Sequence, residues 1–168
     1  MPGVLFPGEV SSVIMRSHGT QPDTRYPLDP VLDFMRLLWS IEHGLQKRSK
    51  QMESELGITG PQRLVLRVVG QFPGLSAGEL AHIVRLHPST ITGILQRLVA
   101  RGLVARARDP QDSRRSRLRL KPRALAYTQP SAGTIEQAVT EALGRAGASN
   151  VRAARKVLAK VAQHLAGA

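Results

Sequence analysis

The sequence predicts a mostly helical fold that carries one small β-hairpin. Apolar residues recur at helical spacing in several segments, and two short segments of alternating apolar and polar residues surround a turn at 109–112. The chain has 168 residues and no cysteine, which excludes disulfides and thiolate metal sites. Residues 1–27 are rich in Pro, Gly and Ser, so we expect a flexible or partly helical arm there.

Positive charge is concentrated in one part of the chain. The net charge is +12, and residues 85–123 hold eleven Lys and Arg against two acids, Asp109 and Asp112. Nine of the twelve net positive charges therefore fall within 39 residues. A basic region of this kind favours a nucleic-acid partner over a merely soluble surface.

The first long helix is expected from Asp29, which can cap it, to Gly57. Its apolar residues form one stripe: Val31, Phe34, Met35, Leu38, Ile41, Leu45, Met52 and Leu56. A second helix begins at Thr59-Gly-Pro and ends at Phe72-Pro-Gly. Its inward face is expected to hold Leu64, Val65, Val68 and Val69.

Two further helices are separated by a tight break at 85–87. Ser76 and Glu79 have the spacing of a capping box, which opens a short helix. Its expected inward residues are Leu80, Ala81, Ile83 and Val84. Pro88 begins the next helix, which ends by Gly102 and has Ile91, Ile94, Leu95 and Leu98 on its inward face.

The alternating segments at 103–108 and 115–120 predict a hairpin around the turn. In the second strand Leu118 and Leu120 share one face. The tail returns to helix: Ile135, Val139 and Leu143 lie on one stripe. After a break, a narrow seam follows at Val151, Ala154, Leu158, Val161 and Leu165, which can pack on a partner chain or within one subunit.

Helix, tight turn, helix, strand, basic turn and strand, in this order, predict a winged helix-turn-helix over residues 58–124. The second helix of the pair fits the major groove and exposes residues that can read bases. These residues are Ser89, Thr90, Thr92, Gly93, Gln96 and Arg97. The wing brings Arg114, Arg115 and Arg117 to the minor groove, and Asp112 is expected to brace it by pairing with Arg106 or Arg114.

Four motifs resemble the MarR family of bacterial regulators. They are Leu75-Ser-Ala-Gly-Glu-Leu-Ala-His, His87-Pro-Ser-Thr-Ile-Thr-Gly-Ile-Leu-Gln-Arg-Leu, Arg101-Gly-Leu-Val-Ala-Arg and Asp109-Pro-Gln-Asp-Ser-Arg-Arg. The resemblance implies a homodimer on a pseudo-palindromic double-stranded DNA operator, with residues 28–57 and 125–168 as dimerisation helices. It also implies release by a small, often phenolic or anionic, ligand. The chain departs from the family pattern after the wing, where it reads Leu120-Lys-Pro-Arg-Ala, and in its longer arm.

A ligand site is predicted more weakly. Trp39 and His43 on the first helix could face Arg63 and Arg67 on the second, which would suit an aromatic acid. The alternative is that Trp39 belongs to the core and both arginines to the surface.

Other functions have less support. No catalytic motif, cofactor motif or metal-ligand spacing of the five histidines is present in the sequence, and no apolar run is long enough to span a membrane. We therefore expect a cytoplasmic regulator that acts as a repressor, and not an enzyme. A nucleoid-type protein with little sequence preference and a winged-helix protein-interaction module remain alternatives.

Overall fold

The computed structural model describes residues 26–108 and 116–167. Over these residues the chain is mostly helical with one antiparallel hairpin, as predicted. The elements are α1 (Pro30–Leu56), α2 (Gly60–Gln71), α3 (Ala77–Val84), α4 (Pro88–Ala100), β1 (Val104–Arg108), β2 (Ser116–Leu120), the 3₁₀ helix η1 (Pro122–Tyr127), α5 (Ile135–Ala146) and α6 (Ala148–Leu165). The boundary between two compact units, residues 1–41 and 42–168, falls inside α1.

Helix α1 begins where the sequence predicted. The Asp29 carboxylate accepts hydrogen bonds from the backbone N–H groups of Val31 (2.9 Å) and Leu32 (3.1 Å), which have no partner within the helix. Met52 is fully buried, but much of the predicted stripe is exposed, including Val31, Met35, Ile41 and Leu45. The helix therefore presents apolar side chains that a single chain leaves in water.

Capping boxes fix the starts of α2 and α3. At α2 the Thr59 hydroxyl accepts a hydrogen bond from the Gln62 backbone N–H, and the Gln62 side-chain oxygen accepts one from the Thr59 backbone N–H. Ser76 and Glu79 form the same two reciprocal bonds at α3. The box at Ser76 and Glu79 was predicted from its spacing; for α2 the sequence predicted a start at Thr59-Gly-Pro but not the pairing of Thr59 with Gln62. Reciprocal bonds of this kind satisfy two exposed backbone donors at once, so they set the first residue of each helix.

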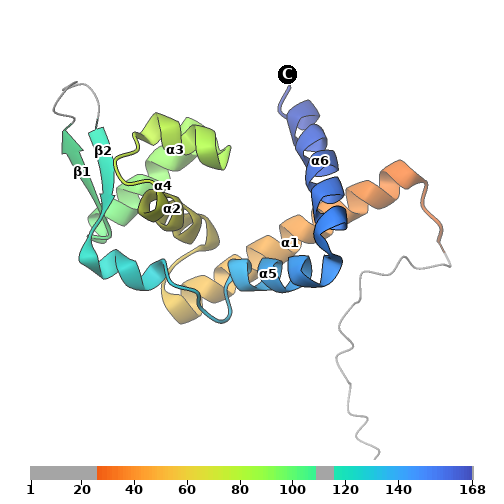
Figure 1. The fold of residues 1–168 in the computed structure, drawn as a ribbon, viewed down its shortest axis with the longest axis horizontal. Helices are drawn as coiled ribbons and strands as arrows, with labels where there is room; N and C mark the ends of the chain where they lie inside the picture. Colours follow the sequence, from red (N-terminus) through yellow and green to blue (C-terminus); the bar gives the residue numbers. More distant parts are fainter. Residues whose placement is uncertain (1–25, 109–115, 168) are drawn as a thin grey trace, which may run out of the picture. The chain divides into compact units, whose positions relative to one another are not determined.

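The core lies among α2, α3, α4 and the hairpin, which Figure 1 shows gathered together. Its fully buried apolar residues include Val65, Leu66, Val69, Leu80, Ile91, Leu95, Leu98 and Leu118. Two predictions of inward residues were wrong: Leu64 and Ile83 are each 44% exposed. The inward face of α2 is instead turned toward Gln62, Arg63 and Leu66, which are buried.

Strand β2 of the wing is hydrogen-bonded along both edges, to β1 on one edge and to the loop between α2 and α3 on the other. The two strands pair antiparallel, with Arg106 opposite Leu118 and Val104 opposite Leu120. On the other edge, the Gly74 N–H donates to the Leu118 carbonyl (2.9 Å) and the Leu118 N–H donates to the Leu75 carbonyl (2.8 Å). The loop between α2 and α3 therefore lies alongside β2 and holds the base of the wing.

The segment after the wing departs from a regular α-helix, in line with its unusual sequence. Residues 122–127 form η1, in which Ala124 is buried, and a loop then leads to α5. Thr134 caps α5 by accepting from the Gln137 N–H at 3.2 Å. No residue of α5 or α6 is buried within the chain. Among the described residues, no helix is long and apolar enough to cross a membrane.

Candidate nucleic-acid interface

Helix α4 has one apolar face and one polar face. The four residues predicted to be inward are buried: Ile91, Ile94, Leu95 and Leu98. The polar residues proposed to read DNA are exposed, with Gly93 half-buried among them: Ser89, Thr90, Thr92, Gln96 and Arg97. The core thus holds α4 by one side and leaves a row of hydrogen-bonding side chains facing outward.

The start of α4 is fixed by a cap that was not predicted from the sequence. The Ser89 backbone N–H donates to Nδ1 of His87 at 3.3 Å, and the Ser89 hydroxyl lies 2.7 Å from the same nitrogen. Pro88 follows as the first helical residue. Histidine is an uncommon N-cap, whereas the nearby Ser89 and Thr90 are of residue types that commonly cap helices, so residue type alone does not indicate His87. The pair holds the first polar residues of α4 in place.

Thr92 forms a hydrogen bond within α4, whereas Gly93 has no packing contact at the position of a Cβ. The Thr92 hydroxyl donates to the Pro88 carbonyl at 2.9 Å, so its oxygen keeps only its acceptor capacity. A Cβ built on Gly93 would meet no atom within 4 Å. Packing within the chain therefore gives no reason for a glycine at this position.

The wing residues fall partly outside the described residues. Arg106 lies on β1 and is exposed, and Arg117 lies on β2 and is half-buried. Asp112, Arg114 and Arg115 lie outside the described residues. The bracing of the wing by Asp112 stays a prediction.

Charge on the described part of this surface is almost entirely positive. Between residues 76 and 108 the one acid is Glu79, which caps α3. The exposed cations of the helix-turn-helix and wing are Arg85, Arg97, Arg101, Arg106, Arg108, Arg119, Lys121 and Arg123. Such a field attracts a polyanion and strengthens at low salt.

The four residues predicted for a ligand site have different surroundings. Trp39 is 60% exposed, whereas Arg63 is 2% exposed. The alternative that put Trp39 in the core and Arg63 on the surface is therefore wrong for both residues. Arg63 donates through Nε to Glu136 (3.0 Å) and through a terminal nitrogen to the Gln129 carbonyl (2.6 Å). Arg67 lies 3.8 Å from the same Glu136 oxygen, and His43 is exposed.

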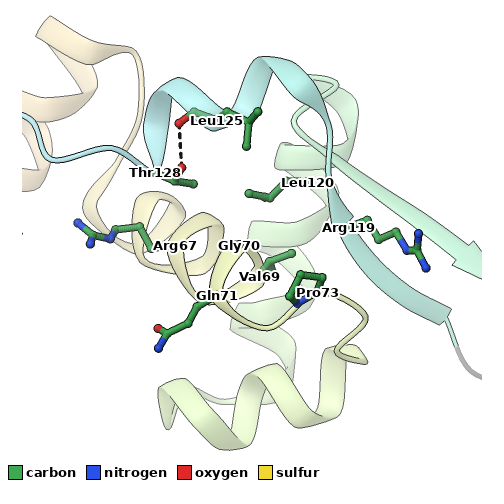
Figure 2. Close-up of a pocket in the computed structure, with 9 residues that line it drawn as sticks. All are labelled: Arg67, Val69, Gly70, Gln71, Pro73, Arg119, Leu120, Leu125 and Thr128. Carbon is green, nitrogen blue, oxygen red and sulfur yellow. Dashed lines mark hydrogen bonds between the residues drawn. The ribbon is translucent and has the colours of Figure 1, made fainter.

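A crevice of about 560 Å³ lies between α2, β2 and η1. Figure 2 shows that its two cations, Arg67 and Arg119, extend in opposite directions, away from one another. The Thr128 hydroxyl is already bonded to the Leu125 carbonyl at 2.8 Å. In a ligand site the polar groups converge on one point. The polar groups of this crevice do not, so we assign no ligand to it.

A second crevice, of about 490 Å³, is mostly apolar. Leu45 of α1, Gly60 and Leu64 of α2, and Ile135 of α5 contribute to its wall. Glu136 also lines it, and its Oε2 is buried without a hydrogen-bond partner among the described residues. The exposure of Leu64, which the sequence placed in the core, is explained by this position.

Comparison with known proteins identifies the family. The family model described as "MarR family" matches residues 56–115. The chain is 29% identical over 125 residues to the HTH-type transcriptional repressor Rv2887 of Mycobacterium tuberculosis, covering 74% of this chain and 90% of that protein. It is 30% identical over 99 residues to the HTH-type transcriptional regulator YsmB of Bacillus subtilis, covering 59% of this chain and 68% of that protein.

Solved structures agree on the fold. The PcaV regulator of Streptomyces coelicolor, solved with its natural ligand, superposes with a TM-score of 0.67 at 29% identity, over 82% of this chain and 97% of that one. A mutant of E. coli MarR bound to operator DNA superposes with a TM-score of 0.62 at 24% identity, over 78% of this chain and 94% of that one. Together with the polar face of α4 and the basic wing, these likenesses establish that the chain belongs to the MarR family and is a DNA-binding transcriptional regulator.

Proposed function

We propose that this regulator is a homodimeric, cytoplasmic repressor that reads an inverted-repeat operator with α4 and clamps it with the wing. The observation that carries the proposal is the outward row of polar side chains on α4, set against its fully apolar inward face. A helix of this kind fits the major groove, where each base pair presents its own pattern of donors and acceptors.

Each polar residue of α4 has a chemical role to fill. Gln96 can bind adenine with two hydrogen bonds, and Arg97 can bind guanine or a phosphate. Thr92 already donates to the Pro88 carbonyl, so its oxygen suits a donor, such as the amino group of adenine or cytosine. Ser89 and Thr90 lie at the start of the helix, which in this mode of binding points at the base edges.

A dimer would give the apolar side chains of the flanking helices a partner. Val139 and Leu143 of α5 and Val157, Leu158 and Leu165 of α6 are each 41–76% exposed. Water-exposed apolar rows at helical spacing support burial against a second chain. Two-fold symmetry would then place the half-site centres about 10 bp apart, or at a multiple of that distance.

Release by a small aromatic or anionic ligand is the second half of the proposal. The apolar crevice beside Leu64 has a volume within the ordinary range for small-molecule sites. The cation that lines this crevice is Lys50. Of the residues proposed from the sequence, Arg63 is occupied by Glu136 and Gln129, and Arg67 does not line the crevice. PcaV, which the chain resembles, was solved with its natural ligand.

Fluorescence anisotropy tests the DNA half. The operator duplex is first selected from random DNA with the purified protein, and binding is then compared with a scrambled duplex at several salt concentrations. We expect a clear preference for the selected duplex, affinity that falls with salt, and loss of the preference in Gln96→Ala. Lys156→Ala, an exposed residue of α6, should behave like wild type.

Other outcomes separate the alternatives. Equal binding to both duplexes would indicate a nucleoid-type protein and overturn sequence-specific repression. Absence of binding to any duplex would overturn the DNA-binding proposal altogether and favour a protein-interaction module.

A further inference from the structure

The turn between α3 and α4 holds an arginine in a conformation that favours glycine. Arg85 has φ 53° and ψ 42°, in the left-handed region. Six glycines also have positive φ: Gly57, Gly74, Gly102, Gly133, Gly147 and Gly167. Among the described residues Arg85 is the one exception to this use of glycine, and side chains with a Cβ are disfavoured there.

The backbone of the turn accounts for the left-handed conformation but not for the arginine. The N–H groups of Arg85 and Leu86 both donate to the Ala81 carbonyl, which closes the end of α3. Those bonds use backbone atoms alone, so glycine would make them equally well and without strain. The reason for arginine must therefore lie in its side chain.

That side chain is exposed, and it has no hydrogen bond or ion pair with any described residue. Leu86, the next residue, is half-buried against the core, so the turn itself is held in place. Arg85 thus combines a strained backbone with an unpaired cation, on a surface that has almost no acids. This combination favours an interaction with a negatively charged partner outside the chain.

We propose that Arg85 contacts a DNA phosphate next to the groove that α4 occupies. The inference rests on the proposed function. When a recognition helix lies in the major groove, the preceding helix crosses the DNA backbone, so the turn that joins them lies at the phosphates bordering the groove. Arginine at this place positions α4 in register without reading any base. The strain in the turn is retained for this interaction.

Three substitutions separate strain from charge. Arg85→Gly removes both, Arg85→Gln keeps the strain and removes the charge, and Arg85→Lys keeps both. Thermal unfolding is measured for each at one protein concentration. Binding to the selected operator and to an unrelated duplex is measured by anisotropy over a salt series.

We expect Arg85→Gly to raise Tm by about 2–4 °C, because the left-handed position is relaxed. Arg85→Gln and Arg85→Lys should keep the wild-type Tm. In Arg85→Gly and Arg85→Gln, the slope of log K against log salt should lessen by about 1 for each phosphate that the side chain no longer neutralises. Affinity should fall about tenfold at 0.1 M salt, equally on both duplexes, while Arg85→Lys keeps the wild-type slope.

Several results would overturn the proposal. If Arg85→Gln kept the wild-type affinity and salt slope while wild type bound its operator, Arg85 would have no DNA role, and the regulator itself would stand. If the weakening appeared on the operator alone, Arg85 would read a base and not a phosphate. If wild type bound no duplex, the proposed function and this inference would fall together.

Discussion

Arg63 and Glu136, 73 positions apart in the chain, are joined by a hydrogen-bonded ion pair of 3.0 Å that fastens α5 to α2. The arginine side chain is 2% exposed and that of the glutamate 30% exposed. A second bond from Arg63 reaches the Gln129 carbonyl in the loop before α5. The buried Arg63 of the helix-turn-helix therefore holds both α5 and the loop that precedes it.

Replacement of Glu136 should destabilise the protein strongly. In Glu136→Gln the Arg63 charge stays buried without its counter-charge, and we expect the free energy of unfolding to fall by about 3 kcal/mol. Urea denaturation at fixed protein concentration measures this change. Glu141→Gln, an exposed residue of the same helix, is the control and should change it by less than about 0.5 kcal/mol. Equal stability of both variants would show that the pair holds nothing together.

Substitution of Gly93 is expected to change stability and DNA affinity in opposite directions. Gly93→Ala adds a methyl group where no atom lies within 4 Å and should stabilise α4 by about 1 kcal/mol. If DNA approaches α4 at this point, operator affinity should fall by about tenfold, or about 1.4 kcal/mol. Gly144→Ala, at an equally open position in α5, is the matched control and should stabilise without changing affinity. Unchanged affinity in Gly93→Ala would remove Gly93 from the interface.

The wing arginines are tested as a pair. Arg114→Ala with Arg115→Ala should weaken binding to every duplex and flatten its salt dependence by about 1 for each phosphate no longer neutralised, with no change in the circular dichroism spectrum. The double variant Arg152→Ala and Lys156→Ala removes the same charge from exposed positions of α6 and serves as the control. A wild-type salt dependence in the wing variant would exclude the wing from DNA binding.

A charged residue introduced into the apolar seam of α6 tests whether this seam forms the dimer interface. Leu158 is 41% exposed in the single chain, and Leu158→Glu would place a carboxylate in the dimer interface that we propose. Sedimentation velocity should then show monomers at micromolar concentration. Lys156→Glu puts the same group on the opposite side of α6 and should stay dimeric. A dimeric Leu158→Glu would show that the subunits meet elsewhere.

Local polar patterns predicted the fold well. The box of Ser76 with Glu79 was predicted because its bonds span three residues, so the information needed lies within one helical turn. The inward and outward faces of α4 followed from its apolar spacing for the same reason. These local signals were sufficient to identify the helix that we propose reads DNA.

Long-range and backbone effects could not be predicted. The burial of Arg63 depends on Glu136, and apolar periodicity cannot identify a polar residue that a distant partner makes buriable. This is why the face of α2 was placed too far toward Leu64. The left-handed Arg85 and the capping His87 likewise require backbone geometry that residue types alone do not specify.

The backbone bonds that join the loop of Gly74 and Leu75 to Leu118 have a consequence for how this surface can vary. Main-chain bonds tolerate a change of side chain but not a change of spacing, because one inserted residue shifts a donor away from its acceptor. Relatives of this chain should therefore exchange the other side chains of the loop while keeping its length and the glycine at position 74, where φ is positive. Insertions are better accommodated at the tip of the hairpin, so the reach of the wing can diverge while its root stays fixed.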